Sequence, residues 1–393
     1  MISESNSLRT FNLLYFVYFA SLGAFYPFIS IFFKARGFSA SQCGLLLAVL
    51  PISKIIIPPL LGFLADQSNT RKTLLATFLL LSVLTMLMLL PSLDFRWTFI
   101  IMTLFAFSRA PVIAFMDSFT HEYLGEQNEI FGKIRRWGSV GFLFASSLFG
   151  WAFAEWTEDS LIVGASVLLF ACYWLTRFKL PDAPSQTHAQ ENSTHKQALK
   201  RFLISPITPP LLIGLAIYYM AHSMFDAYFS WHLIDLGYSE TWIGVGWSIG
   251  VFAEVLIMGI FHKLLRKVAP MHLLIFAAIV SALRWYALAN THDLVWILLS
   301  QPLHAITFGI FYLSCTHWLQ LKGVLIRSTT QSIGLSCIAL GTLAGYQVGG
   351  HLLQHHSSTS MFQLMTTLAL GAGLLFSVAL ALERHQEKFA KTQ

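Results

Sequence analysis

Six charged residues lie inside long apolar runs of this sequence: Lys54, Arg109, Asp117, Asp226, Glu254 and Arg284. A charge in the hydrocarbon of a bilayer costs roughly 2.5–3.5 kcal/mol on insertion scales, so such a side chain usually faces a cavity or a partner. Desolvation favours the neutral form of a carboxylic acid, whereas a nearby cation favours its charged form. These residue types therefore predict proton transfer combined with the binding of a charged solute.

Glu254 is the predicted proton carrier, and either Arg284 or His304 can supply the cation beside it. His304 can also change charge near neutral pH. The alternatives are a purely structural ion pair for Glu254 and a buried, non-titrating histidine at position 304. Asp226 is expected either to bind protons as well or to be matched to a cation of the first half, Arg109 or Lys54.

Cations that can face a central cavity exceed the acids there, and they are Lys54, Arg109 and Arg284, with Arg135 at the cavity edge. This excess favours a substrate that carries a carboxylate. Tyr26 and Trp285 are expected to add aromatic lining. For Lys54 a structural salt bridge is the alternative, and Asp117 can pair with Arg135.

The elements that position these residues are membrane spans. Hydrophobic residues make up 55% of the 393 positions and charged residues only 11%, against roughly 25% charged in a soluble domain. The apolar runs approach or exceed the roughly 20 residues that cross a bilayer. They predict twelve helices near 11–33, 43–65, 73–91, 97–120, 137–155, 160–178, 208–234, 242–265, 271–290, 294–318, 328–353 and 360–382. Bent or broken spans are predicted by Pro51, Pro58, Pro59 and Pro111.

The distribution of basic residues predicts the orientation. With a cytoplasmic amino terminus, 19 of the 25 Lys and Arg fall on the inner side, and three lie outside, at Lys34, Arg36 and Arg96. The positive-inside rule therefore places both termini in the cytoplasm. The net charge of +6 is a topology signal in this interpretation, and nucleic acid is not an expected partner.

The chain divides into two related halves. The polar stretch 179–205 separates them, which predicts a bundle over 1–180, a cytoplasmic linker over 181–206 and a second bundle over 207–393. Gly37-Phe38-Ser39 with Gly44 recurs as Gly237-Tyr238-Ser239 with Gly244, at an offset of 200 residues. Lys54 and Glu254 share this offset. The pattern indicates a duplication, as in transporters that are built from repeats.

A motif follows the second predicted span and reads Gly62-Phe63-Leu64-Ala65-Asp66, then Arg71-Lys72. It resembles the signature of the major facilitator superfamily between spans 2 and 3, although Gln67 and Asn69 depart from it. The resemblance implies that Gly62, Asp66, Arg71 and Lys72 belong to a gating element. It also implies two six-helix bundles around a central cavity.

Further residues narrow the resemblance to the phenylpropionate permease group and, more distantly, to lactose permease: Gly23 to Phe28, Phe131 to Gly141, Phe252 to Val255, Arg284-Trp285, and Leu303-His304 with Thr307-Phe308. The lactose permease pattern implies sugar and proton sites at Glu254, Arg284 and His304, and a substrate contact at Arg135. Thr307 and Gln301 depart from it, and the sugar-binding glutamate of span 4 has no counterpart. A galactoside is therefore not expected.

The sequence thus predicts an all-α membrane transporter of twelve helices that imports a small organic solute with protons, the best guess being an aromatic carboxylic acid. The resemblance places it in a bacterial inner membrane. The proton gradient is the expected energy source, with no cofactor and no metal, and the protein is expected to function as a monomer. The alternatives are a sugar or nucleoside symporter, an exporter of the same fold, or a non-transporting receptor. The sequence has no nucleotide loop, metal cluster or nucleophile–base spacing that would predict an enzyme or an ATP-driven pump.

Overall fold

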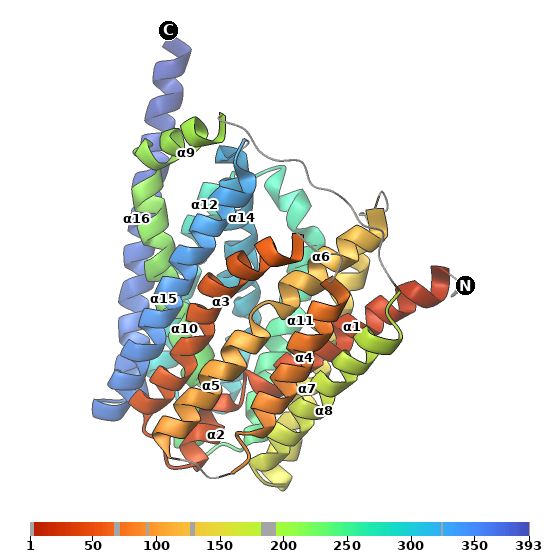
Figure 1. Ribbon diagram of the computed structural model, residues 1–393. Helices are drawn as coiled ribbons and strands as arrows, with labels where there is room; N and C mark the ends of the chain where they lie inside the picture. The colour runs from red at the N-terminus through yellow and green to blue at the C-terminus, as the bar shows by residue number, and fades with distance from the viewer. Residues whose placement is uncertain are drawn as a thin grey trace. The chain divides into compact units, whose positions relative to one another are not determined.

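The computed structural model describes residues 4–66, 71–91, 94–125, 130–181, 194–323 and 325–392. In these ranges the chain is helical and contains no strand. Figure 1 shows the α-helices in chain order, which are α1 (Glu4–Phe25), α2 (Ile29–Ala35), α3 (Ala40–Asp66), α4 (Arg71–Leu87), α5 (Phe95–Arg109), α6 (Val112–Leu124), α7 (Phe131–Glu155), α8 (Asp159–Phe178), α9 (Thr194–Ile204), α10 (Thr208–Asp235), α11 (Glu240–Leu265), α12 (Pro270–Asn290), α13 (Leu294–Leu299), α14 (Phe311–Lys322), α15 (Arg327–His355) and α16 (Ser358–Thr392).

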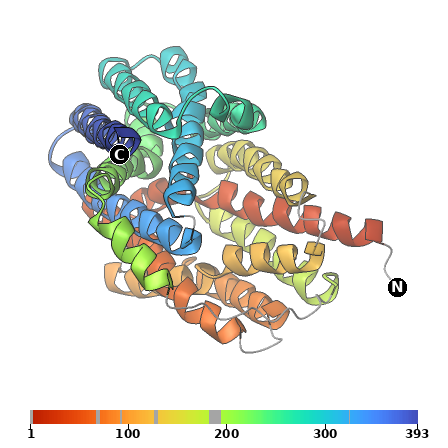
Figure 2. The same cartoon turned by 90° about the horizontal axis from the view of Figure 1, so that it is seen from above.

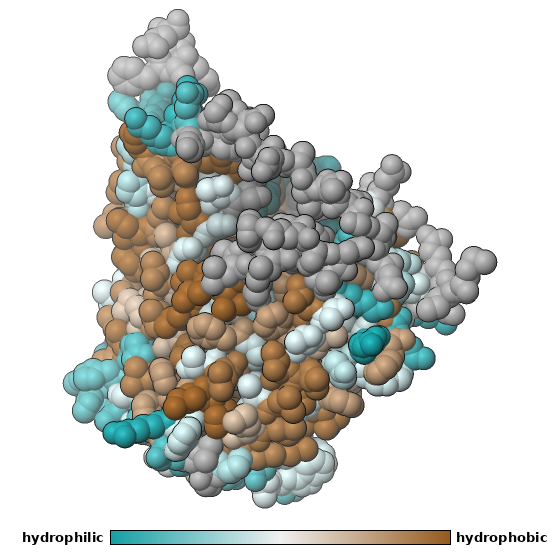
Figure 3. Space-filling view, in the orientation of Figure 1, coloured by the Kyte–Doolittle hydropathy of each residue, from teal (hydrophilic) through white to brown (hydrophobic). Residues whose placement is uncertain are grey.

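The predicted spans are present as helices. Among the described residues, ten segments are long and apolar enough to cross a membrane, the bent pair α9 and α10 adds an eleventh when counted as one span, and α4 is a shorter apolar helix. Hydrogen bonding within each helix satisfies the backbone where lipid offers no partners. Figure 2 views the same ribbons from above. In Figure 3 hydrophobic residues cover the middle of the visible face and hydrophilic residues gather toward its ends. The fold class that the sequence predicts is confirmed.

Prolines interrupt some spans and not others. Pro111 separates α5 from α6, which confirms the predicted break. α3 stays helical through Pro51, Pro58 and Pro59, so the span is not broken there, and a bend at these prolines stays a prediction. A break that the sequence analysis did not predict lies at Pro27, between α1 and α2. Proline removes a backbone donor and clashes with the carbonyl four residues earlier, which accounts for the breaks.

Two compact units form, one from residues 1–188 and 226–248 and the other from residues 189–225 and 249–393. Each of the helices α10 and α11 therefore contributes to both units. The division that we predicted at 181–206 stays a prediction, and much of that segment lies outside the described residues.

Glycines allow close helix packing at matching places in the two units. A Cβ on Gly141 of α7 would lie 2.0 Å from the carbonyl oxygen of Phe16 in α1. In the second unit a Cβ on Gly341 of α15 would lie 2.1 Å from the carbonyl oxygen of Ala216 in α10. Only glycine permits such an approach. Both glycines and both partners are 200 residues apart, which extends the predicted duplication into three-dimensional packing.

The repeated Gly-aromatic-Ser turns also share one backbone conformation. Gly37 and Gly237 have φ angles of 82° and 83°, which favour glycine. The amide of Phe38 donates to the carbonyl of Phe33 at 3.1 Å, and the amide of Tyr238 donates to that of Leu233 at 3.0 Å. These bonds close a helix end by the Schellman pattern.

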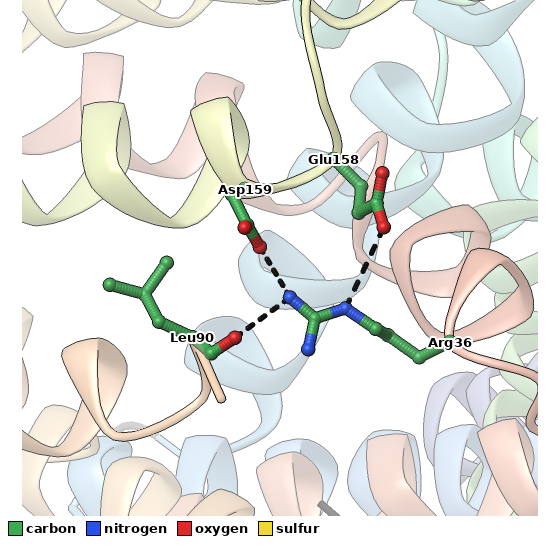
Figure 4. A network of polar contacts seen from close by, with 4 residues as sticks. All are labelled: Arg36, Leu90, Glu158 and Asp159. Carbon is green, nitrogen blue, oxygen red and sulfur yellow. Dashed lines mark hydrogen bonds and ion pairs between the residues drawn. The ribbon is translucent and has the colours of Figure 1, made fainter. Parts of the chain in front are cut away.

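Polar contacts tie together loops at one end of the first unit. Arg36, just after α2, donates to the carboxylate of Asp159 and, at 2.9 Å, to the carbonyl of Leu90 (Figure 4). Its Nε lies 3.8 Å from Glu158. Lys34 pairs with Asp235 in the same unit. The predicted topology places these residues outside the cell.

Candidate functional site

Two membrane spans of the first unit are interrupted where they carry polar side chains. α1 ends at Phe25, and Tyr26 begins the turn that contains Pro27. α5 ends at Arg109, immediately before Ala110 and Pro111. In transporters, discontinuous spans often carry the residues of the binding site. The two breaks fall at Tyr26 and Arg109, which the sequence analysis predicts to bind substrate.

Arg109 and Tyr26 are in direct contact. Nη1 of Arg109 donates a hydrogen bond to the Tyr26 hydroxyl at 2.8 Å, and the guanidinium carbon lies 4.7 Å from the tyrosine ring centroid. Arg109 is 7% exposed, and its Nε is buried without a hydrogen-bond partner. The ammonium group of Lys54, an exposed residue, also interacts electrostatically with the Tyr26 hydroxyl. Three predicted substrate-binding residues thus meet, with two cations beside one phenol.

Two acids were expected to pair with cations of this unit. The match of Asp226 to Arg109 or Lys54 stays a prediction. Asp117 accepts a hydrogen bond from Tyr15 at 2.6 Å and does not form an ion pair with Arg135. Asp117 is therefore held by a tyrosine hydroxyl.

Arg135 lies on aromatic rings. Its guanidinium carbon is 4.1 Å from the ring centroid of Phe19 and 5.8 Å from that of Tyr15. This arrangement is a cation–π contact, which holds a cation on an aromatic face without a carboxylate. Arg135 is half-buried in α7. A role for Arg135 in substrate binding stays a prediction.

The tenth span carries the polar residues of the second unit on an irregular helix. α13 ends at Leu299, a 3₁₀ turn covers Gln301–Leu303, and a π-helical segment covers Ala305–Ile310 before α14 begins. π-helical turns are rare and often mark functional sites. Here the irregular backbone carries Gln301, His304 and Thr307.

Arg284 is held by neutral side chains from this segment. It is fully buried, Nη1 donates to Oγ1 of Thr307 at 3.0 Å, and Nη2 donates to Oε1 of Gln301 at 2.8 Å. The guanidinium carbon also lies 4.4 Å from the ring centroid of Phe225. Thr307 and Gln301 are the two positions that depart from the lactose permease pattern. Sequence reasoning noted these departures but missed their role as partners of Arg284.

Glu254 and His304 are brought together as predicted. Oε2 of Glu254 lies 3.7 Å from Nε2 of His304, and their side chains are 14% and 7% exposed. The His304 ring stacks on Phe308, with ring centroids 5.2 Å apart, and on His222 at 5.5 Å. His222 is a buried member of this cluster that sequence reasoning missed. Its position four residues before Asp226 on the same helix was the available signal.

The remaining predicted residues have different outcomes. Trp285 is buried and packs on Phe225, with ring centroids 5.1 Å apart, so it supports the Arg284 cluster from within the unit. Of the predicted gating residues, Gly62, Asp66 and Arg71 are described only by their helical backbone, and their surroundings lie outside the described part of the structure. Lys72 donates to the carbonyl of Leu180 at 2.6 Å.

Comparison with known proteins finds matches over most of the chain. Residues 8–364 match the MFS_1 like family. The chain is 25% identical over 371 residues to a probable 3-phenylpropionic acid transporter of Escherichia coli, covering 94% of this chain and 97% of that protein. It is 24% identical to the maltose permease of Geobacillus stearothermophilus over 94% of both chains. The crystal structure of the nucleoside transporter NupG superposes with a TM-score of 0.81 at 17% identity, over 95% of this chain and 99% of that one.

Proposed function

Because this chain belongs to the MFS_1 like family of membrane transporters, we propose that it imports a small aromatic carboxylic acid together with protons. A bacterial inner membrane, two cytoplasmic termini and a monomeric working unit complete the proposal. The proton gradient is the proposed source of energy, and no cofactor is required. The relative described as a probable 3-phenylpropionic acid transporter supports an acid of that type.

The observation that carries the substrate class is the meeting of two cations without an acid. Arg109 and Lys54 converge on Tyr26, and neither forms an ion pair among the described residues. A buried guanidinium is costly unless an anion or several acceptors compensate it. A substrate carboxylate supplies both the charge and the acceptors, and the fork of an arginine can hold it at two points.

The surroundings of the pair suit an aromatic ring. Phe105 lies 5.9 Å from the Arg109 guanidinium, measured from its ring centroid to the guanidinium carbon. Phe25 meets Tyr26 edge to face, with ring centroids 5.6 Å apart. Aromatic contacts of this kind contribute both apolar area and directional preference. An aromatic acid would therefore find charge and ring contacts at neighbouring points of the first unit.

Proton coupling is assigned to Glu254 with His304. An ionised carboxylate inside the membrane is costly without a compensating cation. Protonation makes the carboxyl neutral and removes this cost during the conformational change. The contact with His304 gives the proton a second site within one unit. Asp226 stays a candidate for the same role, and Arg135 and Arg284 stay candidates for substrate contacts.

Ligand binding to purified protein tests the substrate class. We expect 3-phenylpropionate to raise the melting temperature, and 3-phenylpropanol, uridine and maltose to have little effect, because only the acid supplies an anion. Arg109→Gln should abolish the effect of the acid. Arg96→Gln is the matched control, because Arg96 is an exposed arginine on the same helix.

Equal stabilisation by the alcohol would contradict the proposal that the substrate is a carboxylic acid. A larger effect of uridine or maltose would favour the nucleoside or sugar alternative. Uptake of labelled acid into proteoliposomes under an imposed proton gradient tests direction and coupling. Binding without net movement would identify a receptor, and outward movement alone would identify an exporter.

A further inference from the structure

A cavity of about 340 Å³ lies in the second unit, apart from the residues assigned to transport. Its walls come from α9, the start of α10, the end of α14 and the turn that follows α14. The residues that line it and carry nitrogen donors on long side chains are Gln197, Arg201, Trp318 and Lys322. None of the residues proposed to bind substrate or protons is part of its wall.

The donors of this cavity lack sufficient acceptors. Trp318 is 3% exposed, and its indole Nε1 is buried without a hydrogen-bond partner. Arg201 is exposed and forms no ion pair within the described part of the chain. Lys322 is paired with Glu383, with 2.6 Å between Nζ and Oε1. A buried N–H without an acceptor is unfavourable, so the cavity favours a ligand that carries acceptor oxygens and negative charge.

Apolar side chains next to the cavity are exposed in a way that suits lipid. Leu203 and Ile204 of α9 are 48% and 68% exposed, and Leu325 in the cavity wall is 63% exposed. α9 is bent by 73° from α10, and Figure 1 shows it lying across the direction of that span. A short helix with basic and apolar residues that turns away from a span fits the membrane interface.

The side of the membrane suggests which lipid is involved. The positive-inside rule places α9 and the end of α14 at the cytoplasmic face. The cytoplasmic leaflet carries anionic phospholipids, whose head groups attract basic residues near the surface. The phosphate of such a lipid provides the acceptor oxygens and the negative charge that the cavity lacks. The acyl chains of the same lipid can cover the exposed side chains of Leu203, Ile204 and Leu325.

We propose that this cavity binds the head group of an anionic phospholipid from the cytoplasmic leaflet. Arg201 and the indole N–H of Trp318 donate to the phosphate oxygens, and Lys322 adds charge while it remains near Glu383. The acyl chains lie against Leu203, Ile204 and Leu325. This site is independent of the proposed substrate and would hold α9 against the rest of the second unit.

Lipid titration of the full-length protein in neutral detergent tests the proposal. Native mass spectrometry counts bound phosphatidylglycerol, with phosphatidylcholine as the zwitterionic comparison. Arg201→Gln removes a charge-assisted hydrogen bond to the phosphate, so it should weaken binding of phosphatidylglycerol roughly tenfold. Lys200→Gln is the matched control, because Lys200 is the exposed neighbour on α9 that does not line the cavity. Trp318→Phe, which removes only the N–H, should also weaken binding of phosphatidylglycerol.

Three results would overturn the proposal. Equal losses in Arg201→Gln and Lys200→Gln would mean general surface attraction rather than a site. Equal binding of phosphatidylcholine would remove the requirement for an anionic lipid. Stabilisation of the wild type by glycerol phosphate to the same extent as by phosphatidylglycerol would identify a site for soluble phosphates. Substrate binding is measured separately in the same samples, so failure of the lipid site and failure of the proposed function are distinguishable.

Discussion

Arg109 donates a hydrogen bond of 2.8 Å to the hydroxyl of Tyr26, and each residue lies at a proline-associated break in its own membrane span. The two residues are 83 positions apart in the chain. The contact links the two interrupted helices and orients one edge of the guanidinium. A tyrosine that holds an arginine in place should affect ligand affinity more than protein stability.

Tyr26→Phe is expected to weaken binding of the acid roughly tenfold, because hydrogen bonds to charged groups contribute about 1.5–3 kcal/mol. Isothermal titration with 3-phenylpropionate measures the change. Tyr286→Phe, at an exposed tyrosine of α12, is the control and should leave affinity unaltered. An unchanged affinity in Tyr26→Phe would remove the tyrosine from the site.

Glu254→Gln is expected to abolish proton-driven accumulation while exchange of preloaded substrate continues, since glutamine stays neutral at every pH. Proteoliposomes with and without a pH gradient separate the two activities. Glu240→Gln, on the same helix α11, should accumulate substrate normally. Full accumulation by Glu254→Gln would exclude Glu254 from coupling.

Arg284→Lys is expected to lower both substrate affinity and stability. Lysine cannot span Gln301 and Thr307 as the arginine fork does, and unsatisfied buried polar groups cost about 1–3 kcal/mol. Thermal unfolding should therefore occur at a lower temperature. Arg135→Lys should weaken binding with little loss of stability, because Arg135 is half-buried on aromatic rings. Wild-type affinity for the acid in both variants would contradict their assignment to an anionic head group.

Gly141→Ala and Gly341→Ala are expected to destabilise the protein by about 1–3 kcal/mol or more, as overpacking does in cores. The added Cβ would lie 2.0 Å from a backbone oxygen at position 141 and 2.1 Å from one at position 341. A backbone atom cannot move aside without displacing its helix. Gly132→Ala in α7 meets no atom within 4 Å and is the control. Equal melting temperatures for all three variants would refute the close packing at these glycines.

Asp66→Asn is expected to slow transport and to shift the resting protein toward the inward-open state. The second half has Lys263 four residues after Gly259, where the motif in the first half has Asp66, so the gate should depend on Asp66 alone. Reactivity of cysteines introduced at cytoplasmic cavity positions measures the shift. Wild-type reactivity together with a full transport rate would contradict this role.

Several properties of this protein were determined by the sequence alone. Apolar runs long enough for a bilayer, the 200-residue offset and the motif around Asp66 predicted the fold and the family, and both are confirmed. Hydropathy is a local property, because each segment partitions into lipid largely by its own composition. The intramembrane charges were visible for the same reason, since each one interrupts an apolar run.

Only the tertiary structure decided which of these charges meet. Arg284 contacts Gln301 and Thr307, which in the sequence had marked only departures from a related pattern. Tyr26 and Arg109 meet because two breaks fall together, and one of those breaks, at Pro27, was not predicted. Contacts between helices depend on their rotation, depth and crossing, which are set by packing at residues such as Gly141 and Gly341 rather than by the composition of any one span.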